Sequence, residues 1–256
     1  CVTALRTVVV LVFAWLMVWV TGSDLSLDQV DSRSMILLLL SGLATGGSWL
    51  CYFKALSLGS VQSVAPVDKS SIVWTMLFGA LIFQEDISSP TSIIGMILIV
   101  LGIVLMLPSA KGKSRTDGKK WLVYAIFSAV FASASALLGK AGIEGVDSYL
   151  GTAVRTLVVV VMAWLLVLVK RKGKLIRDVR LGSFGVIALS GVATGASWLC
   201  YYRALQTGPI HVIAPIDRLS IVFTVLFSAV FLHEKLSAKL LIGLAVNVLG
   251  TLLLLL

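Results

Sequence analysis

Two acidic side chains stand within apolar sequence, each shortly after a proline. Residues 65–68 read Ala-Pro-Val-Asp and residues 214–217 read Ala-Pro-Ile-Asp. In one interpretation Pro66 and Pro215 break helices near a cavity, and because an ionisable side chain is costly in apolar surroundings, Asp68 and Asp217 carry protons or meet the solute there. A structural interpretation also fits, because proline is tolerated in the first turn of a helix and an acid there favours the positive end of the helix dipole. In that interpretation each motif begins a helix.

Two arginines, each followed by threonine, also lie within apolar runs, at Arg6 and Arg155. Arg155 comes about two helical turns after a break at Asp147, which is roughly 10 Å at a rise of 1.5 Å per residue. A guanidinium at that depth needs a carboxylate partner or a polar cavity. It therefore either pairs structurally with another helix or binds an anionic or zwitterionic solute. Lys140 is a further candidate for lining a cavity.

Aromatic residues occur in pairs at positions i and i+3, each pair preceded by a serine. This spacing puts both rings on one face of a helix. The rings either pack within the protein or line an apolar cavity that has a few polar groups, as small-molecule sites commonly do. The residues concerned are Ser48, Trp49, Tyr52, Ser197, Trp198 and Tyr201.

The elements that hold these residues are predicted by composition. Of the 256 residues, 59% are hydrophobic and 13% are charged, and the mean hydropathy of +1.04 excludes a soluble globular domain. A membrane-spanning helix needs about 20 apolar residues. We predict nine such helices, at 1–20, 35–56, 62–83, 91–108, 121–141, 149–169, 183–205, 212–232 and 239–256.

The pattern along these runs favours helices over strands. No stretch of about ten residues alternates in polarity as a membrane barrel strand does, and a helix satisfies its backbone polar groups internally. The sequence therefore predicts an all-α polytopic membrane protein.

The chain contains an internal duplication. Residues 41–56 and 190–205 are identical at 12 of 16 positions, at an offset of 149 residues (190 − 41). The same offset pairs Arg6 with Arg155 and Glu85 with Glu234. We predict a first repeat at 1–108, a basic loop at 109–120 and a second repeat at 121–256. The helix at 121–141 has no counterpart in the first repeat, so a complete first repeat would have another helix before residue 1.

Two five-helix repeats would insert in opposite orientations, because an odd number of helices reverses the second copy. Loop charge supports this expectation. The loop at 21–33 carries Asp24, Asp28 and Asp31 against one arginine, whereas its counterpart at 170–180 carries six basic residues. Equivalent loops of opposite charge are what two oppositely inserted copies require.

The formal net charge of +9 falls mostly in the loops at 111–120 and 170–180. Basic loops collect on the cytoplasmic side of a membrane, so we predict that both are cytoplasmic. Neither loop has the aromatic residues interleaved with basic ones that would suggest nucleic-acid binding. The charge therefore indicates orientation in the bilayer.

Several classes of chemistry lack their usual signatures. The two histidines have no partners at metal-ligand spacing, so we predict neither a metal site nor a cofactor. No phosphate-binding loop for ATP is present, and no group of nucleophile and base gathers on one side of the membrane. We therefore expect a protein that is not an enzyme.

The chain resembles the EamA-type proteins of the drug/metabolite transporter superfamily. The resemblance rests on the two repeats, on Ala65-Pro66 and Ala214-Pro215, and on the acids Glu85 and Glu234 at the ends of the helices that follow. It also rests on a glycine-containing last helix in each repeat. The resemblance implies an inverted-repeat carrier that works by alternating access, with a central site at the interface of the repeats.

From these observations we expect a secondary active transporter of small organic metabolites or drugs in a cell membrane, in particular a bacterial inner membrane. A gradient of protons or Na⁺, or exchange of solutes, would drive it. A channel and a non-transporting membrane scaffold are the alternatives. The expected partners are a small-molecule solute and the lipid bilayer, and the sequence indicates no particular oligomeric state.

Overall fold

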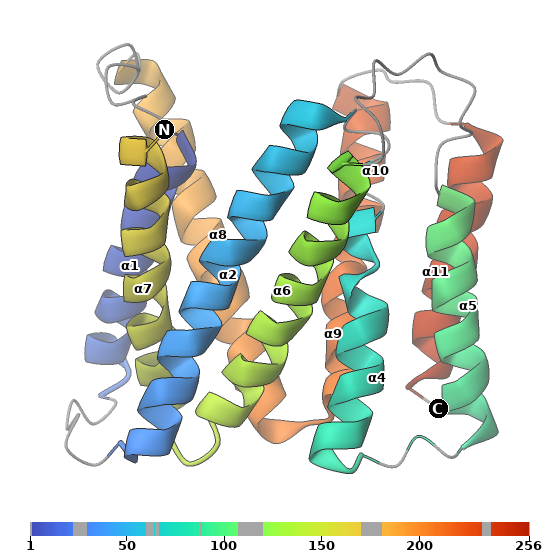
Figure 1. Ribbon diagram of the computed structural model, residues 1–256, viewed down its shortest axis with the longest axis horizontal. Helices are drawn as coiled ribbons and strands as arrows, with labels where there is room; N and C mark the ends of the chain where they lie inside the picture. The colour runs from blue at the N-terminus through green and yellow to red at the C-terminus, as the bar shows by residue number, and fades with distance from the viewer. Residues whose placement is uncertain are drawn as a thin grey trace. The chain divides into compact units, whose positions relative to one another are not determined.

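The structure is a computed structural model that describes residues 2–22, 30–59, 64, 67–85, 87, 89–106, 120–169, 181–231 and 237–255. Regular structure in these ranges is entirely helical, in agreement with the predicted all-α class. The helices are α1 (Val2–Val20), α2 (Ser32–Leu58), α4 (Ser71–Phe83), α5 (Pro90–Met106), α6 (Lys120–Gly142), α7 (Ser148–Val169), α8 (Leu181–Thr207), α9 (Ile210–Arg218), α10 (Ser220–Phe231) and α11 (Ala238–Leu253) (Figure 1).

Six stretches within the described residues are long and apolar enough to cross a membrane, so the chain is a multi-pass membrane protein. They are Val2–Val20, Ser32–Leu58, Lys120–Gly142, Ser148–Val169, Phe184–Thr207 and Ile210–Phe227. The count of nine spans stays a prediction. The loop at 170–180, and all of the loop at 111–120 except Lys120, lie outside the described residues.

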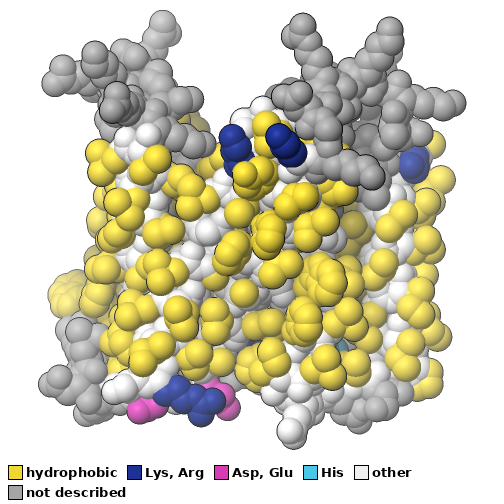
Figure 2. All heavy atoms as spheres, in the orientation of Figure 1, with side chains coloured by type: hydrophobic (Ala, Val, Ile, Leu, Met, Phe, Trp, Pro, Cys, Tyr) yellow, Lys and Arg dark blue, Asp and Glu magenta, His cyan; other side chains and the backbone are white. Residues whose placement is uncertain are grey.

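Large hydrophobic side chains are exposed along the helices, among them Leu81, Val186 and Phe223. On the face shown in Figure 2, hydrophobic side chains cover much of the helices, and charged side chains lie near helix ends. This distribution suits contact with lipid tails, with the charged groups held toward the headgroups.

The chain folds as two compact units. Unit 1 contains residues 1–50 and 134–207, and unit 2 contains residues 51–133 and 208–256. The division falls within α2 and within α6. Each unit thus combines segments from both predicted sequence repeats, whose boundaries at 1–108 and 121–256 stay a prediction from the sequence.

Glycines bring helices into close contact in unit 1. A Cβ on Gly42 of α2 would lie 2.7 Å from the Cβ of Val158 on α7, and a Cβ on Gly191 of α8 would lie 2.6 Å from the Cβ of Val9 on α1. Both residues of the second contact correspond to those of the first at the offset of 149. Gly46 against Met162 and Gly195 against Phe13 repeat the relation. These glycines therefore allow close helix packing.

Helices α1 and α7 pack against each other through two apolar clusters, and four residues of each cluster correspond at the same offset. In each cluster, three buried aliphatic residues from the two helices contact a partly buried tryptophan. The first contains Ala4, Ala163, Val167 and Trp164, and the second contains Ala153, Ala14, Val18 and Trp15. Each helix thus contributes to one cluster the counterparts of the residues that the other helix contributes to the second cluster.

In unit 2, α5 packs closely along α11. A Cβ on Gly95 would lie 2.8 Å from the carbonyl oxygen of Gly250, and a Cβ on Gly243 would lie 2.9 Å from the carbonyl oxygen of Gly102. Nearby, the buried side-chain amide of Asn247 donates to the carbonyl oxygen of Ile99 at 3.4 Å. The absence of side chains at the glycines lets the two backbones approach each other.

The two Ala-Pro motifs do not both begin helices. Ala65 and Pro66 lie outside the described residues, but Pro215 lies inside α9, which ends three residues later at Arg218. Proline has no N–H to donate to the carbonyl of residue 211, which weakens the helix there. The expectation that Asp217 occupies a first turn is therefore wrong, because Asp217 lies in the last turn of α9, just before α10 begins.

Substitution of Gly102 by alanine should lower stability. The new Cβ would lie 2.7 Å from the backbone nitrogen of Asn247, which cannot move aside as a flexible side chain could. We expect Gly102→Ala to reduce the free energy of unfolding by about 1 to 3 kcal/mol. Thermal unfolding of the detergent-solubilised protein, followed by circular dichroism, would measure this change.

Gly185→Ala is the matched control. Gly185 lies in α8, and a Cβ added there would have no atom of the described residues within 4 Å, so alanine should be neutral or more stable by up to about 1 kcal/mol. Equal unfolding temperatures for the two variants would contradict the close contact between α5 and α11.

Candidate functional site

Arg155 lies within α7, at a position set by the start of that helix. The carboxylate of Asp147 accepts hydrogen bonds from the backbone N–H groups of Tyr149 at 2.9 Å and Leu150 at 3.2 Å. These groups are among the first N–H donors of α7, which have no partner within the helix. Asp147 therefore caps α7, and Arg155 follows about two turns later, as the sequence predicted.

The guanidinium of Arg155 is bound by hydroxyl groups from two other helices. Its Nε donates to the Oγ of Ser41 at 2.8 Å, and its Nη2 donates to the Oγ1 of Thr45 at 2.7 Å and to the Oγ of Ser135 at 3.0 Å. Ser41 and Thr45 lie on α2 and Ser135 lies on α6. Ser41 also donates to the carbonyl oxygen of Ser135 at 2.7 Å, which links these two helices directly.

Two aromatic rings of α8 lie against the same guanidinium. The Cζ of Arg155 lies 5.1 Å from the ring centroid of Trp198 and 4.8 Å from that of Tyr202, both within the range of cation–π contacts. Tyr202 can approach α6 because residue 139 is glycine, where a Cβ would lie only 2.6 Å from the Cε1 of the tyrosine ring. All of these residues belong to unit 1.

Two donors of Arg155 remain unused. A guanidinium has five N–H donors, and the single donor of Nε and both donors of Nη2 go to the three hydroxyls. Nη1 is buried and has no acceptor in the described part of the chain, although only 5% of the residue's surface is exposed. No carboxylate among the described residues forms an ion pair with it. Among the described residues, the guanidinium therefore has no charged partner, and the two donors of Nη1 have no acceptor.

Arg6, the counterpart of Arg155 in the repeat, has different surroundings. It is half-buried on α1, and its Nε is buried without an acceptor among the described residues. The carbonyl oxygen of Arg6 lies 3.2 Å from a Cβ built on Gly191. In the same way, the carbonyl oxygen of Arg155 lies 3.0 Å from a Cβ built on Gly42. The backbones correspond, but within the described ranges the hydroxyl partners are present for Arg155 alone.

Unit 2 contains the predicted residues Asp68 and Tyr52 in one neighbourhood. Asp68 is half-buried just before α4, and its Oδ1 accepts a hydrogen bond of 2.6 Å from the Oγ of Ser128 on α6. Tyr52 packs against a cluster that includes Val67, the residue next to Asp68. This carboxylate is thus partly withdrawn from solvent and hydrogen-bonded to a hydroxyl of another helix.

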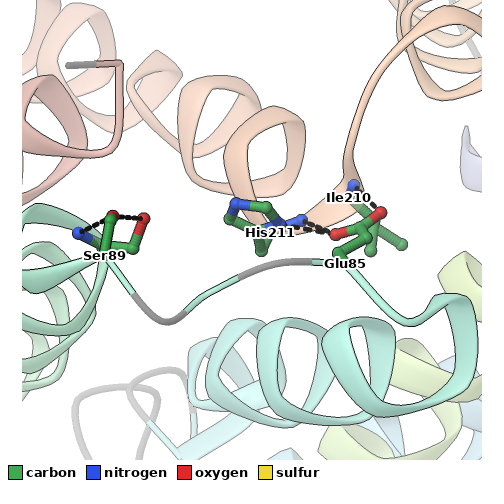
Figure 3. A network of polar contacts seen from close by, with 5 residues as sticks. Glu85, Ser89, Ile210 and His211 are labelled. Carbon is green, nitrogen blue, oxygen red and sulfur yellow. Dashed lines mark hydrogen bonds and ion pairs between the residues drawn. The ribbon is translucent and has the colours of Figure 1, made fainter.

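A second polar pair in unit 2 was not predicted. Gln84 ends α4 in the left-handed conformation, at φ 51°, and this turn directs Glu85 toward the beginning of α9. Figure 3 shows the carboxylate of Glu85 beside Ile210 and His211. It accepts hydrogen bonds from the backbone N–H groups of Ile210 at 2.7 Å and His211 at 3.1 Å, and it contacts the Nδ1 of His211 at 2.6 Å.

The Glu85 carboxylate thus accepts hydrogen bonds from the first backbone N–H groups of α9, which have no partner within the helix. Its negative charge also stabilises the positive end of the helix dipole. When Glu85 is ionised its carboxylate only accepts hydrogen bonds, and the Nδ1 of His211 is then the donor of the shortest contact. The side chains of Glu85 and His211 are nearly buried, at 9% and 8% exposure, so this link joins the end of α4 to α9 away from solvent.

A similar cap begins α5. The backbone N–H of Ser92 donates to the Oγ of Ser89 at 3.1 Å, directly before Pro90 at the first helical position (Figure 3).

Of the other predicted residues, Tyr201 adjoins the Arg155 site, because its ring centroid lies 5.4 Å from that of Tyr202. Trp49 packs on the cluster around Ala4 in unit 1, which is the packing interpretation. Ser197 and Asp217 are exposed, and Ser48 is buried. Lys140 and Tyr201 are half-buried on α6 and α8. Of the eleven predicted candidates, the structure thus brings Arg155 and Trp198 together in one polar site, and it places Tyr52 near Asp68.

Sequence reasoning missed the hydroxyl partners of Arg155 and the pairing of His211. Ser41 and Thr45 stand at i and i+4 on one face of α2, and the repeat has Ser190 and Thr194 at the corresponding positions. A duplicated hydroxyl pair alongside a duplicated arginine was the available signal. For Ser135, in the helix without a counterpart, and for His211 the sequence offered no comparable signal.

Comparison with known proteins places the chain among transporters. The profile of the EamA-like transporter family matches residues 1–107 and 119–256. A Sinorhizobium protein named as an uncharacterized transporter in the cobO 3′ region is 37% identical over 136 residues, which are 53% of this chain and 96% of that protein. A Listeria innocua protein named as a candidate for sugar uptake is 28% identical over 120 residues, 45% of this chain and 40% of that protein.

A solved crystal structure shares the fold. It superposes on 100% of this chain and 88% of its own chain with a TM-score of 0.82, at 18% sequence identity.

Replacement of Glu85 by glutamine should destabilise the start of α9. The amide keeps one acceptor oxygen but loses the charge and one of the two acceptors, so a buried N–H is left unpaired. We expect a loss of about 1 to 3 kcal/mol in the free energy of unfolding, measured by thermal denaturation in detergent. Glu144→Gln, at an exposed position between α6 and α7, is the matched control and should change stability by less than about 0.5 kcal/mol. A melting temperature for Glu85→Gln equal to that of the control would contradict the capping role.

Proposed function

Because the chain belongs to the EamA-like transporter family, we propose that it is a secondary carrier that moves small organic metabolites or drugs across a cell membrane by alternating access. The observation that carries the proposal is the buried guanidinium of Arg155. It keeps two donors for which the described protein supplies no acceptor. Inside apolar helices such a group is costly, which favours a role in binding a solute.

The position of this group supports a solute site at the interface of the two sequence repeats. Ser41 and Thr45 come from the first repeat, whereas Ser135, Arg155 and Trp198 come from the second. A small movement of one repeat against the other would change the distances between these groups. Binding at such an interface can therefore be coupled to a conformational change.

Equivalent contacts support the inverted arrangement that alternating access uses. Val9 contacts Gly191 as Val158 contacts Gly42, and Gly95 faces Gly250 as Gly243 faces Gly102. Contacts of this kind arise when two similar copies are related by a pseudo-two-fold axis. In carriers with this symmetry, the two copies exchange conformations to open the site first to one side of the membrane and then to the other.

The carrier would work in a bacterial inner membrane, with the basic loops at 111–120 and 170–180 in the cytoplasm. The charge asymmetry of the loops supports the orientation, and the transporter named from Sinorhizobium supports the bacterial setting. Asp68 is the proposed proton-coupling group, since its carboxylate is half-buried and bonds to the neutral hydroxyl of Ser128.

Uptake into proteoliposomes tests both the carrier and its site. With a panel of organic anions, amino acids, organic cations and sugars, we expect saturable uptake of at least one class. Unlabelled solute inside the proteoliposomes should accelerate the uptake of labelled solute from outside. Arg155→Gln should lower the rate by about 100-fold, the factor that corresponds to losing hydrogen bonds from a charged donor.

Arg203→Gln is the control, because Arg203 is exposed on α8 and bonds within its own helix to Gln206. It should transport at close to the wild-type rate. Flux that neither saturates nor shows counterflow would indicate a channel, no flux of any solute would indicate a scaffold, and wild-type rates in Arg155→Gln would remove Arg155 from the site.

Substitution of Asp68 separates coupling from transport. Asp68→Asn cannot bind and release a proton, so we expect counterflow to continue while accumulation driven by a pH gradient is lost. Asp31→Asn, at an exposed position before α2, is the control and should accumulate solute normally. Unchanged accumulation in Asp68→Asn would exclude Asp68 as the coupling group.

A further inference from the structure

The geometry around Arg155 points to the class of solute, an inference that rests on the proposed function. We propose that the site binds a small organic solute through a single carboxylate held at Nη1 of Arg155. The solute supplies the acceptor and the negative charge that the described residues around this guanidinium lack. Neither the family profile nor the names of the relatives specify a solute of this class.

The pattern of bonds leaves one nitrogen of the guanidinium, Nη1, for the carboxylate. The fork formed by Nε and Nη2 is occupied by the hydroxyls of Ser41, Thr45 and Ser135, which hold the plane of the guanidinium. The remaining two donors both belong to Nη1. Hydrogen bonds from a guanidinium to an ionised carboxylate are shorter and about twice as strong as those to a neutral acceptor. A carboxylate at Nη1 therefore completes the set.

No acidic residue described in unit 1 lies at the depth of Arg155, so the negative charge that would balance this arginine has to come from the solute. The acidic residues that the structure describes in this unit are Asp31, Glu144 and Asp147, and all three lie at or beyond helix ends. Arg155 is about two turns inside α7, and an arginine stays charged in proteins. Hydroxyls and aromatic rings stabilise that charge without neutralising it. A monoanionic solute neutralises it without leaving an excess.

The single positive charge of Arg155 disfavours other classes of solute. An organic cation would be repelled by the uncompensated guanidinium. A sugar hydroxyl could accept from Nη1 but would leave the charge in place. A phosphate monoester carries between about 1.5 and 2 negative charges, which exceed what one arginine compensates. The rings of Trp198 and Tyr202 cover the guanidinium face, so the solute meets an apolar surface next to its carboxylate.

Binding to the purified full chain in detergent tests the solute class without requiring transport. The probes are phenylacetate and phenylacetamide, which have nearly the same shape but differ in charge, and phenyl phosphate. Titration calorimetry at pH 7.5 should show phenylacetate binding about 100-fold more tightly than phenylacetamide. Arg155→Gln should remove this difference, and the exposed-site control Arg203→Gln should retain it.

The wild-type comparison remains decisive even if Arg155→Gln fails to fold. Equal affinity for phenylacetate and phenylacetamide would overturn the proposal and would mean that water or another neutral group serves Nη1. Tighter binding of phenyl phosphate would also overturn it, in favour of a dianion. Carboxylate-selective binding with no transport of any solute would support this inference and refute the proposed function. Saturable transport of sugars or cations alone would support the proposed function and refute this inference.

Discussion

A positive charge that cannot be removed, buried among membrane helices, is the constraint on which the arrangement of unit 1 depends. Because a guanidinium keeps its proton, the protein has to provide acceptors where Arg155 lies. It does so with hydroxyls from α2 and α6 and with two aromatic faces from α8, so that one side chain of α7 contacts three other helices. The hydroxyls are neutral and use only three donors, which leaves both charge and hydrogen-bonding capacity for a solute.

Close helix packing is what allows these short side chains to reach the guanidinium. Serine and threonine extend only a few ångströms from the backbone, so α2 has to approach α7 closely. Gly42 and Gly46 permit that approach, because any side chain there would collide with Val158 and Met162. The corresponding glycines of α8 do the same toward α1. The apolar packing and the polar site are therefore parts of one arrangement.

The two duplicated arginines have corresponding backbones but different side-chain surroundings. The repeat places Arg6 on α1 as it places Arg155 on α7, and the backbone contacts to glycine correspond. Ser190 and Thr194 correspond to Ser41 and Thr45 in the repeat. Among the described residues, however, the hydrogen bonds from hydroxyls to Arg155 are not reproduced around Arg6.

Much of this fold follows from the sequence, and part of the site does. Long apolar runs predicted seven helices to within three residues at each end, because hydropathy is a local pattern. The run at 62–83 is less well matched, since α4 begins at residue 71, and the run at 212–232 is divided between α9 and α10. Pro215 lies inside α9, so of the two positions that the sequence left open, the one at the start of a helix is wrong. A proline signals the first turn of a helix and an interrupted helix equally well. Arg155 stood out by its charge. Ser135 and His211 did not, because which residues of distant helices meet is decided by helix rotation and packing.

The most direct test of this account is a structure of the protein with 4-bromobenzoate, whose bromine is located by anomalous scattering. The account predicts a bromine position beside Trp198 and Tyr202, with a carboxylate oxygen about 2.8 Å from Nη1 of Arg155. Water at Nη1, with the bromine elsewhere or absent, would contradict it.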